Sequence, residues 1–376
     1  MRFRSQLTNI AVFAKLTASL SSLGKVCWVR LEDEAIRFTI IPDQGTQVWA
    51  QLPIDALFES YTIEAAAGVI NLEVPIGSLN RALRSALRES TAQLRLTKKG
   101  PLPLLALTVV RSSWTDGKNP LGVRQERSST AVTTAPGQQQ IQQQGDDATS
   151  TSAATTSEVV QCHRPRERET VITQEIPVRV LHPTAVENLH QPRCPEPDVH
   201  IVLPPLIQLK AISERFIKLA LGGSRSATGP TSLSSAPAPT AAAAGGIAGS
   251  GPKLELSANM HGSLKLAITT DALRISSVWS GLVNPSLDPA QLSQSALEQH
   301  PSERMRAMGA EGDGREERGW AKVRIDGKDW SRVLSVGRLS PKVVAAFIHD
   351  TALILYVYLP GDDDCCLTYY INSYAS

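Results

Sequence analysis

Cysteine and aromatic residues are scarce in this sequence, and long apolar runs are absent from it. The five cysteines are an odd number without a C-x-x-C spacing, which argues against both a disulfide framework and a zinc site and favours a reducing compartment. No apolar stretch is long enough to span a bilayer, so we expect no membrane partner. Aromatic residues make up only 5% of the chain, which argues against a stacking platform for single-stranded nucleic acid.

Motifs of catalysis are also missing. The sequence contains no G-x-x-x-x-G-K-[ST], G-x-S-x-G or H-E-x-x-H motif, and none of its 7 histidines has a cysteine or acid at convincing ligand spacing. The acidic run at residues 361–364 lies between two strand-like segments, and a turn explains it better than a metal site does. We therefore expect no catalytic residue, no metal and no cofactor.

Positive and negative charge are nearly balanced, with 38 basic and 36 acidic residues. Any attraction to nucleic acid must therefore come from where the basic residues lie, not from their total. Residues 1–30 contain no acid and carry an amphipathic stripe, as a mitochondrial transit peptide does. This composition alone keeps a mitochondrial enzyme as an alternative, although the stripe runs directly into a strand-like segment. The stripe consists of Ile10, Phe13, Leu16, Leu20 and Leu23.

Three segments have the composition of disordered loops, because none of them can bury enough apolar surface to offset the entropy of ordering. They lie at about residues 112–168, 222–251 and 281–319. We interpret them as insertions into the loops of a smaller, compact scaffold, where long excursions cost little free energy.

The remainder of the chain reads as short strands and a few helices in an α+β fold. The order of these elements is similar in the two halves, which indicates an internal duplication. We expect a first domain at residues 1–181 and a second at 198–376. The proline-rich stretch at 182–197 between them is typical of an exposed connector.

The predicted helices have apolar faces opposite basic ones. In the helix within "SLNRALRSALRES" no acid precedes Glu89, so the arginines have no opposite charge beside them. Its expected buried face consists of Leu79, Ala82, Leu83, Ala86 and Leu87, and its arginines are Arg81, Arg84 and Arg88. The helix in the second half has the expected buried face Leu206, Leu209, Ile212, Phe216 and Leu219.

The other predicted helices are basic as well, whereas the acids lie mainly in strands, loops and insertions. Such a distribution predicts a phosphate-backbone partner, and the lack of base-reading motifs predicts binding to duplex DNA without sequence preference. Ordinary solvated helix faces also contain many lysines and arginines, so this alternative stays open. The remaining basic candidates are Lys15, Lys25, Lys210, Arg215, Lys218, Lys328 and Arg332.

Four stretches resemble the Hus-type subunit of the nine-one-one checkpoint clamp, a ring related to the replicative clamp PCNA. They are "MRFRSQLTNIAVFAKLTASLSSLGKVCWVRL", "VWAQL" with "LNRALRSA", the run from "TQEIPVRVL" to "LIQLKAISERF", and "GLVNP". The resemblance implies two similar domains, each with two helices packed on antiparallel sheets. It also implies Rad-nine-type and Rad-one-type partner subunits, a dedicated clamp loader, helices lining a pore around DNA, and a location in the nucleus with the cytoplasm as a second site.

Ring closure by such a subunit needs open sheet edges. "VITQEIPVRV" alternates with few charges and would be an aggregation risk if left unpaired, although an internal strand is an equally good explanation of its pattern. The resemblance implies one edge at Val171, Ile172, Ile176 and Val178, and a second at Leu273, Ile275 and Val278. It also implies that partner peptides dock against the connector at 182–197. A homotrimeric replication processivity clamp remains the alternative function.

Overall fold

The computed structural model describes most of the chain outside the long insertions. The described residues are 1–42, 45–65, 68–88, 91–114, 167–223, 252–271, 273–286, 298–310, 319–340, 342–359 and 365–374. The predictions of disorder for the greater part of the three insertions lie outside these ranges.

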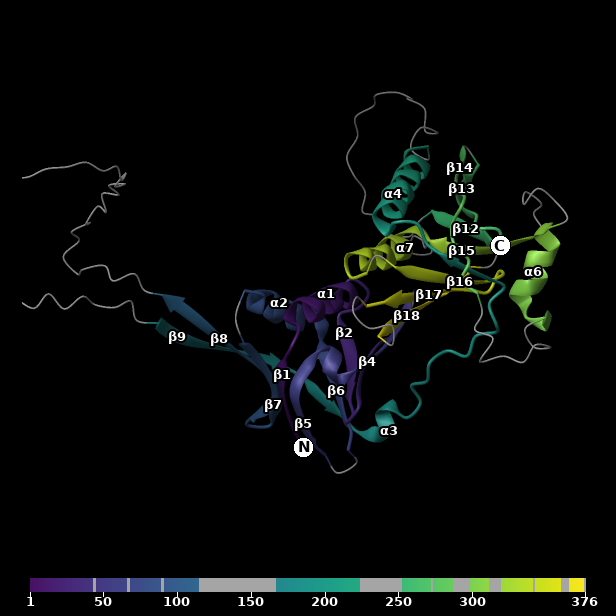
Figure 1. The fold of residues 1–376 in the computed structure, drawn as a ribbon. Coiled ribbons are helices and arrows are strands. Elements are labelled where there is room, and N and C mark those ends of the chain that lie inside the picture. The colour runs from purple at the N-terminus through teal and green to yellow at the C-terminus, as the bar shows by residue number, and fades with distance from the viewer. Residues whose placement is uncertain are drawn as a thin grey trace, which may run out of the picture.

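The described residues of the first half form ten strands, two long helices and two short ones (Figure 1). In chain order they are β1 (Arg2–Leu7), α1 (Ile10–Ser21), β2 (Val26–Leu31), β3 (Ala35–Ile40), β4 (Gln47–Pro53), η1 (Ile54–Ala56), β5 (Phe58–Glu64), β6 (Ile70–Pro75), α2 (Ile76–Ala86), β7 (Thr91–Lys99), β8 (Leu102–Trp114), β9 (Glu167–Pro177), β10 (Arg179–Leu181) and α3 (Pro183–Val186).

The second half repeats the alternation of strands and helices. Its elements are β11 (Val199–Val202), α4 (Leu206–Gly223), β12 (Lys253–Asn259), β13 (Leu264–Thr270), β14 (Leu273–Trp279), α6 (Pro301–Ala310), β15 (Trp320–Asp326), α7 (Gly327–Val333), η3 (Leu334–Arg338), β16 (Val343–Ile348), β17 (Ala352–Tyr358) and β18 (Cys366–Asn372).

Three antiparallel sheets carry these helices. One has the order β5-β1-β7-β8-β9, and another has the order β14-β13-β12-β15. The third is a nine-stranded sheet, β10-β6-β2-β3-β4-β18-β17-β16-β11, in which β4 of the first half pairs with β18 of the second. The two halves therefore share one continuous sheet, and the domain boundary at the connector stays a prediction.

The β8–β9 pair extends beyond the sheet to which it belongs. Strand β7 pairs with β8 only as far as Val110, whereas β8 and β9 pair with each other out to Trp114 and Glu167. Figure 1 shows this two-stranded ribbon projecting from the body of the molecule. The predicted insertion at 112–168 is therefore wrong at both ends, because its first and last residues belong to strands.

Helix α1 begins where Asn9 accepts a hydrogen bond from the backbone N–H of Val12 at 3.0 Å. Phe13, Leu16 and Leu20 then fall on one side and are at most 1% exposed. The stripe that is typical of a transit peptide is thus, in its central residues, the buried face of a core helix.

Two leucines assigned to buried helix faces are exposed. Helix α2 ends at Ala86, so Leu87 caps the helix instead of continuing its buried face, and it is 46% exposed. In α4, Leu219 is 45% exposed and Ala220 is buried in its place. At about 100° per residue, Ala220 returns to within about 40° of Leu206, whereas Leu219 lies about 140° away.

The third predicted insertion contains a docked helix, so the prediction of disorder across all of 281–319 is wrong. Helix α6 contacts β11 and β12, and His300, Ser302 and Met305 at its first turns are buried. The prediction failed because this helix is only weakly amphipathic and its attachment uses polar groups. His261 Nε2 lies 3.2 Å from the Arg306 carbonyl oxygen of α6. At the start of the helix, the Ser302 N–H and hydroxyl lie 3.2 and 2.7 Å from His300 Nδ1.

The docking of α6 on β11 places two histidines together, which predicts a pH-dependent stability. The rings of His200 and His300 lie 6.2 Å apart, and burial together with the charge of His300 lowers the pKa of His200. The unfolded chain therefore binds more protons than the folded chain once the pH falls below about 6.5, and the free energy of unfolding decreases there.

We expect the urea midpoint of unfolding of the wild-type chain to decrease when the pH is lowered from about 7 to about 5.5. The urea midpoint of His200→Gln should decrease less over the same interval. His190→Gln is the control, because His190 is exposed on the connector. Equal pH dependence in the wild type and in His200→Gln would contradict this role of His200.

Candidate nucleic-acid interface and subunit edges

Helices from both halves lie in succession along one side of the molecule. Figure 1 shows α2, α1, α7 and α4 in this order, and contacts join α2 to α1, α1 to η3, and α7 to α4. We call the exposed surface of these helices the helix face. Their opposite sides pack on the sheets, so one continuous surface is available to a long partner.

The helix face carries most of the basic residues that the sequence singled out. Lys210 is half-buried, 4.0 Å from Glu214 one turn away. Arg332 is exposed but donates to Asp329 at 3.2 Å. Exposed pairs of this kind contribute about 0.3–0.5 kcal/mol, so both cations stay available to a stronger anion. The exposed candidates are Lys15, Lys25, Arg81, Arg84, Arg88, Arg215, Lys218, Lys328 and Arg332.

Arg81 and Arg84 on α2, together with Arg88 just after it, form a basic stripe. At about 100° per residue, Arg81 and Arg84 lie about 60° apart around the helix axis, and Arg88 follows two residues after the helix ends at Ala86. Arg81 donates to Ser78 Oγ at 3.2 Å, and none of the three arginines has an ion-pair partner among the residues that the structure describes. The stripe therefore concentrates positive charge with no described carboxylate to neutralise it.

Strands β9 and β14 lie at the edges of their sheets. Val171 and Ile172 on β9 and Val278 on β14 are 62%, 40% and 57% exposed, while Leu273 and Ile275 are half-buried. Ile176 and Val178, which the sequence analysis also assigned to the first edge, are 3% and 8% exposed and belong to the core. The interface assignment for their side chains is wrong, because they point inward in the alternation along this edge.

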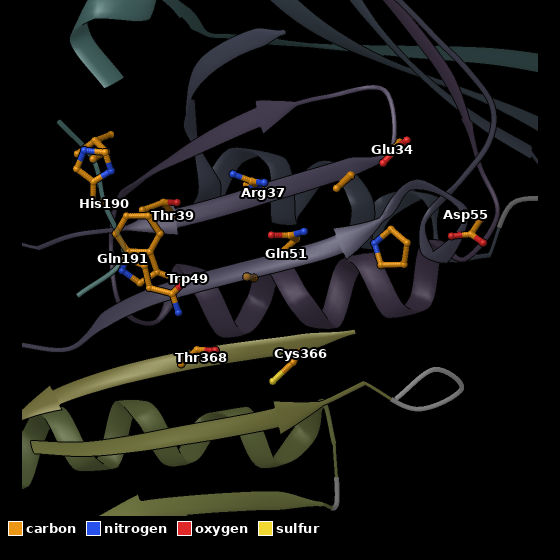
Figure 2. Close-up of a pocket in the computed structure, with 14 residues that line it drawn as sticks. Glu34, Arg37, Thr39, Trp49, Gln51, Asp55, His190, Gln191, Cys366 and Thr368 are labelled. Carbon is orange, nitrogen blue, oxygen red and sulfur yellow. The ribbon is translucent and has the colours of Figure 1, made fainter. Parts of the chain in front are cut away.

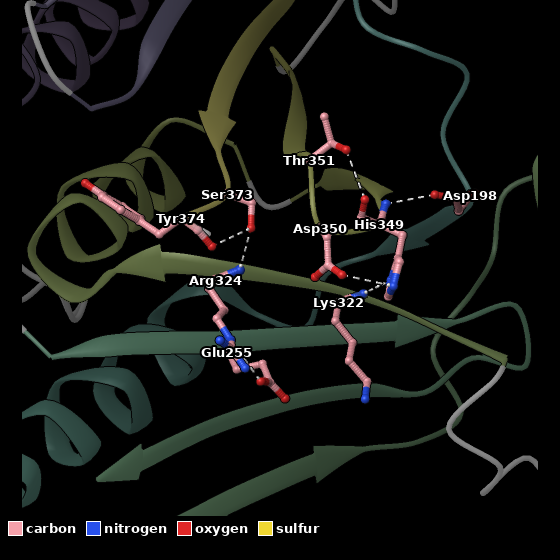
Figure 3. Close-up of polar contacts among 9 residues, drawn as sticks. All are labelled: Asp198, Glu255, Lys322, Arg324, His349, Asp350, Thr351, Ser373 and Tyr374. Carbon is pink, nitrogen blue, oxygen red and sulfur yellow. Dashed lines mark hydrogen bonds and ion pairs between the residues drawn. The ribbon is translucent and has the colours of Figure 1, made fainter. Parts of the chain in front are cut away.

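The opposite edge of the β14 sheet is covered. Along β15, the Arg324 N–H donates to Ser373 Oγ and the Tyr374 N–H donates to the Arg324 carbonyl, at 3.1 and 2.9 Å. The Lys322 N–H donates to His349 Nδ1 at 3.1 Å, and the Asp350 N–H donates to the Lys322 carbonyl at 2.8 Å (Figure 3). The chain end and the β16–β17 turn thus occupy the groups through which a partner strand would pair.

The free side of β11, at one end of the nine-stranded sheet, is covered in a similar way. The Val202 N–H donates to the Val283 carbonyl at 2.8 Å, and Asn284 Nδ2 donates to the His200 carbonyl. Gly262 permits this approach, because a Cβ at its position would collide with the Leu282 carbonyl. The other edge strands are β5, β9, β10 and β14. Of these four, β9 and β14 carry exposed apolar side chains, Val171, Ile172 and Val278.

A polar hollow of about 730 Å³ lies on the sheet side, where β3, β4 and β18 meet the connector (Figure 2). We call it the outer pocket. His190 and Gln191 of the connector border it, and Gln191 Nε2 donates to the hydroxyl of Tyr370 on β18. Trp49 also lines it, and its indole N–H is buried without an acceptor among the residues that the structure describes.

Three of the described cysteines, Cys27, Cys194 and Cys366, do not have the properties of nucleophiles. Burial raises the pKa of Cys27 to about 12, and it also raises the pKa of Cys194 and Cys366. Thiols in such surroundings stay protonated and unreactive at neutral pH. Among the described residues no cluster of His, Cys, Asp and Glu could hold a metal ion, and no helix is long and apolar enough to cross a membrane.

Solved structures with a similar fold include PCNA chains. The proliferating cellular nuclear antigen of Entamoeba histolytica aligns with a TM-score of 0.52 at 12% identity and covers 99% of both chains. A chain of the PCNA2–PCNA3 complex of Sulfolobus tokodaii aligns with the same TM-score at 13% identity, over 99% of this chain and 100% of that one. These structures define the class, a PCNA-like clamp fold of the α+β type, as the sequence predicted.

Sequence comparison gives the family. The family model described as Hus1-like protein matches residues 1–375. "Checkpoint protein hus1" of Schizosaccharomyces pombe is 30% identical over 379 residues, which cover 100% of this chain and 99% of that protein. The human "Checkpoint protein HUS1" is 20% identical over 312 residues, or 81% and 82% of the two chains. The chain belongs to the Hus1-like family, and the resemblance of the quoted stretches is confirmed.

The exposed edge valines provide a test of the open edges. We expect Val171→Lys and Val278→Lys each to change the free energy of unfolding by no more than about 0.5 kcal/mol, because both side chains face solvent. Each lysine should nevertheless weaken the addition of a partner strand at its own edge.

The matched control is Ile176→Lys on β9, which should cost about 3 kcal/mol or more because it buries an unpaired charge. Urea unfolding measures the stability, and size-exclusion chromatography with partner clamp subunits measures the assembly. Unchanged assembly by both valine variants would refute the edge assignment.

Proposed function

We propose that this chain is a non-enzymatic subunit of a heterotrimeric checkpoint clamp that encircles duplex DNA at sites of damage. The observation that carries the proposal is the common helix face, where helices of both halves present cations on one side while open edges lie at β9 and β14. A ring built through these edges would turn its helices toward the DNA. Modest phosphate contacts then suffice for retention, because escape requires the ring to open.

The partners that we propose are a Rad-nine-type and a Rad-one-type subunit, with a dedicated loader that closes the ring around DNA. The names of the S. pombe and human relatives as checkpoint proteins support a checkpoint role over a role in replication. A nuclear location, with the cytoplasm as a second site, follows from that role and remains part of the proposal.

Recruitment of signalling and repair factors is assigned to the sheet side of the ring. The outer pocket offers charged groups from Glu34, Arg37 and Asp55 beside the connector, a combination suited to an extended peptide. The raised thiol pKa values and the lack of a catalytic motif support a scaffold without enzymatic activity.

The solution mass of this chain, alone and after co-expression with both partner types from the same source, tests the proposal. We expect a monomer alone and a one-to-one-to-one complex with the partners. A stable homotrimer of the isolated chain would favour the alternative, a replication processivity clamp. A monomer that ignores both partners would reject the assembly.

The basic stripe of α2 provides a second test, on the assembled ring. Arg81→Gln, Arg84→Gln and Arg88→Gln combined should remove about three phosphate contacts and reduce the slope of log affinity against log salt by about 2.7. Ring assembly should be unchanged, because the three side chains are exposed and point away from the core.

A matched triple variant on the sheet side, Arg30→Gln, Arg37→Gln and Arg179→Gln, removes the same charge from residues that pair with Glu32 and Glu73. It should leave the salt dependence almost unchanged. Filter binding or fluorescence anisotropy at several salt concentrations measures both. The same loss in both triples would show that only net charge matters and would overturn the pore assignment.

A further inference from the structure

A hollow of about 670 Å³ opens on the helix face where the helices of the two halves meet. The end of α1 and the residues after it form one wall, the first turn of α2 forms another, and α7 closes the third side. We call it the junction hollow. Its lining residues are Ser21, Ser22, Leu23, Gly24, Lys25, Pro75, Gly77, Ser78, Arg81 and Arg332.

Cations from three separate elements converge on the junction hollow. Lys25 follows α1, Arg81 belongs to α2, and Arg332 comes from α7 in the second half of the chain. One carboxylate opposes them, that of Asp329, which lies 3.2 Å from Arg332. Burial and the nearby charge of Asp326 raise the pKa of Asp329, and the guanidinium of Arg332 opposes this change. The balance in the hollow is positive.

Contacts between the two halves hold the walls in place. The hydroxyl of Ser22 lies 3.1 Å from the hydroxyl of Ser335 and 3.4 Å from the carbonyl oxygen of Arg332. The Ile76 N–H donates to the carbonyl of Lys25 at 3.2 Å, which ties the start of α2 to the segment after α1. The cations therefore converge on a shallow, open depression whose walls are tied to one another.

The donors around the hollow match a phosphate group. Guanidinium groups present paired N–H donors that fit two phosphate oxygens, and an ammonium adds a point charge. Arg81 gives one N–H to Ser78 Oγ and keeps its remaining donors. Ser21, Ser22 and Ser78 line the same space. The hydroxyls of Ser21 and Ser22 donate to the carbonyls of Ala18 and Ser19, whereas Ser78 Oγ accepts from Arg81 and keeps its own proton. Gly77 leaves room beside the first turn of α2.

We propose that the junction hollow is a discrete site for one phosphodiester group of the DNA backbone, held jointly by the two halves of the chain. The inference rests on the proposed clamp function and sharpens it. An evenly basic pore lining would give every exposed cation a similar small share of the binding. With a discrete site, Arg81 and Arg332, which line the hollow, contribute more to the binding free energy than Arg84 and Lys328, which do not line it.

The test compares matched cations on the same helix in the assembled ring, bound to a nicked circular duplex. On α2, Arg81→Gln should weaken binding about tenfold and Arg84→Gln about twofold, because only Arg81 faces the hollow. On α7, Arg332→Gln and Lys328→Gln should show the same contrast. Arg332→Lys keeps the charge without the paired donors and should recover only part of the loss. Thermal unfolding of each variant confirms that the fold is retained.

Equal twofold losses from all four glutamine variants would overturn the discrete site and leave the clamp function standing. No loss from any of them would overturn both. Inorganic phosphate, exchanged for chloride at constant ionic strength, distinguishes a DNA phosphodiester from a free anion. If phosphate raises the unfolding temperature of the wild-type chain but not that of Arg332→Gln, while all four variants bind DNA equally, the hollow takes a free anion and the assignment to DNA is wrong.

Discussion

The pairing of β4 with β18 is the constraint on which the rest of this structure depends. It joins strands from the two halves into one nine-stranded sheet, with Ala50 opposite Leu367 and Trp49 opposite Thr368. Because the helices of each half cover the same side of the structure, this one register places α1 and α2 in line with α7 and α4. A slip by one residue would turn the apolar set of β18 outward and break this alignment. The basic helix face, the junction hollow and the outer pocket all derive their geometry from it.

The parts of the fold that could be predicted from sequence are those that local periodicity determines. The period of α2 places Leu79 and Leu83 in the core and Arg81 and Arg84 in solvent, and the structure agrees. The sequence also shows the alternation of residues along β9, but it does not show which of the two alternating sets faces the core. A strand with apolar residues on both faces does not indicate which face the core takes, so Ile176 and Val178 were assigned to an interface although they are buried.

Features that depend on distant segments could not be predicted from the sequence. Nothing near β15 indicates that Tyr374 would occupy its edge, and nothing near β11 indicates that Val283 would bond to Val202. Helix α6 was missed for a related reason, since its docking depends on Met305 and on a histidine beside His200 rather than on a repeated apolar pattern. The junction hollow belongs to the same group, because Arg332 reaches it from the other half of the chain.

The β8–β9 ribbon also has a consequence for how the chain can vary. Residues 115–166 leave and rejoin the described fold through one antiparallel pair, Trp114 opposite Glu167, whose Cα atoms lie about 5 Å apart. On β8, four residues follow Val110, the last residue that also pairs with β7. Trp114 therefore lies about 13 Å from the end of the three-stranded part of the sheet. Because both ends of this segment meet at one pair, a change of its length does not by itself shift the register between β8 and β9.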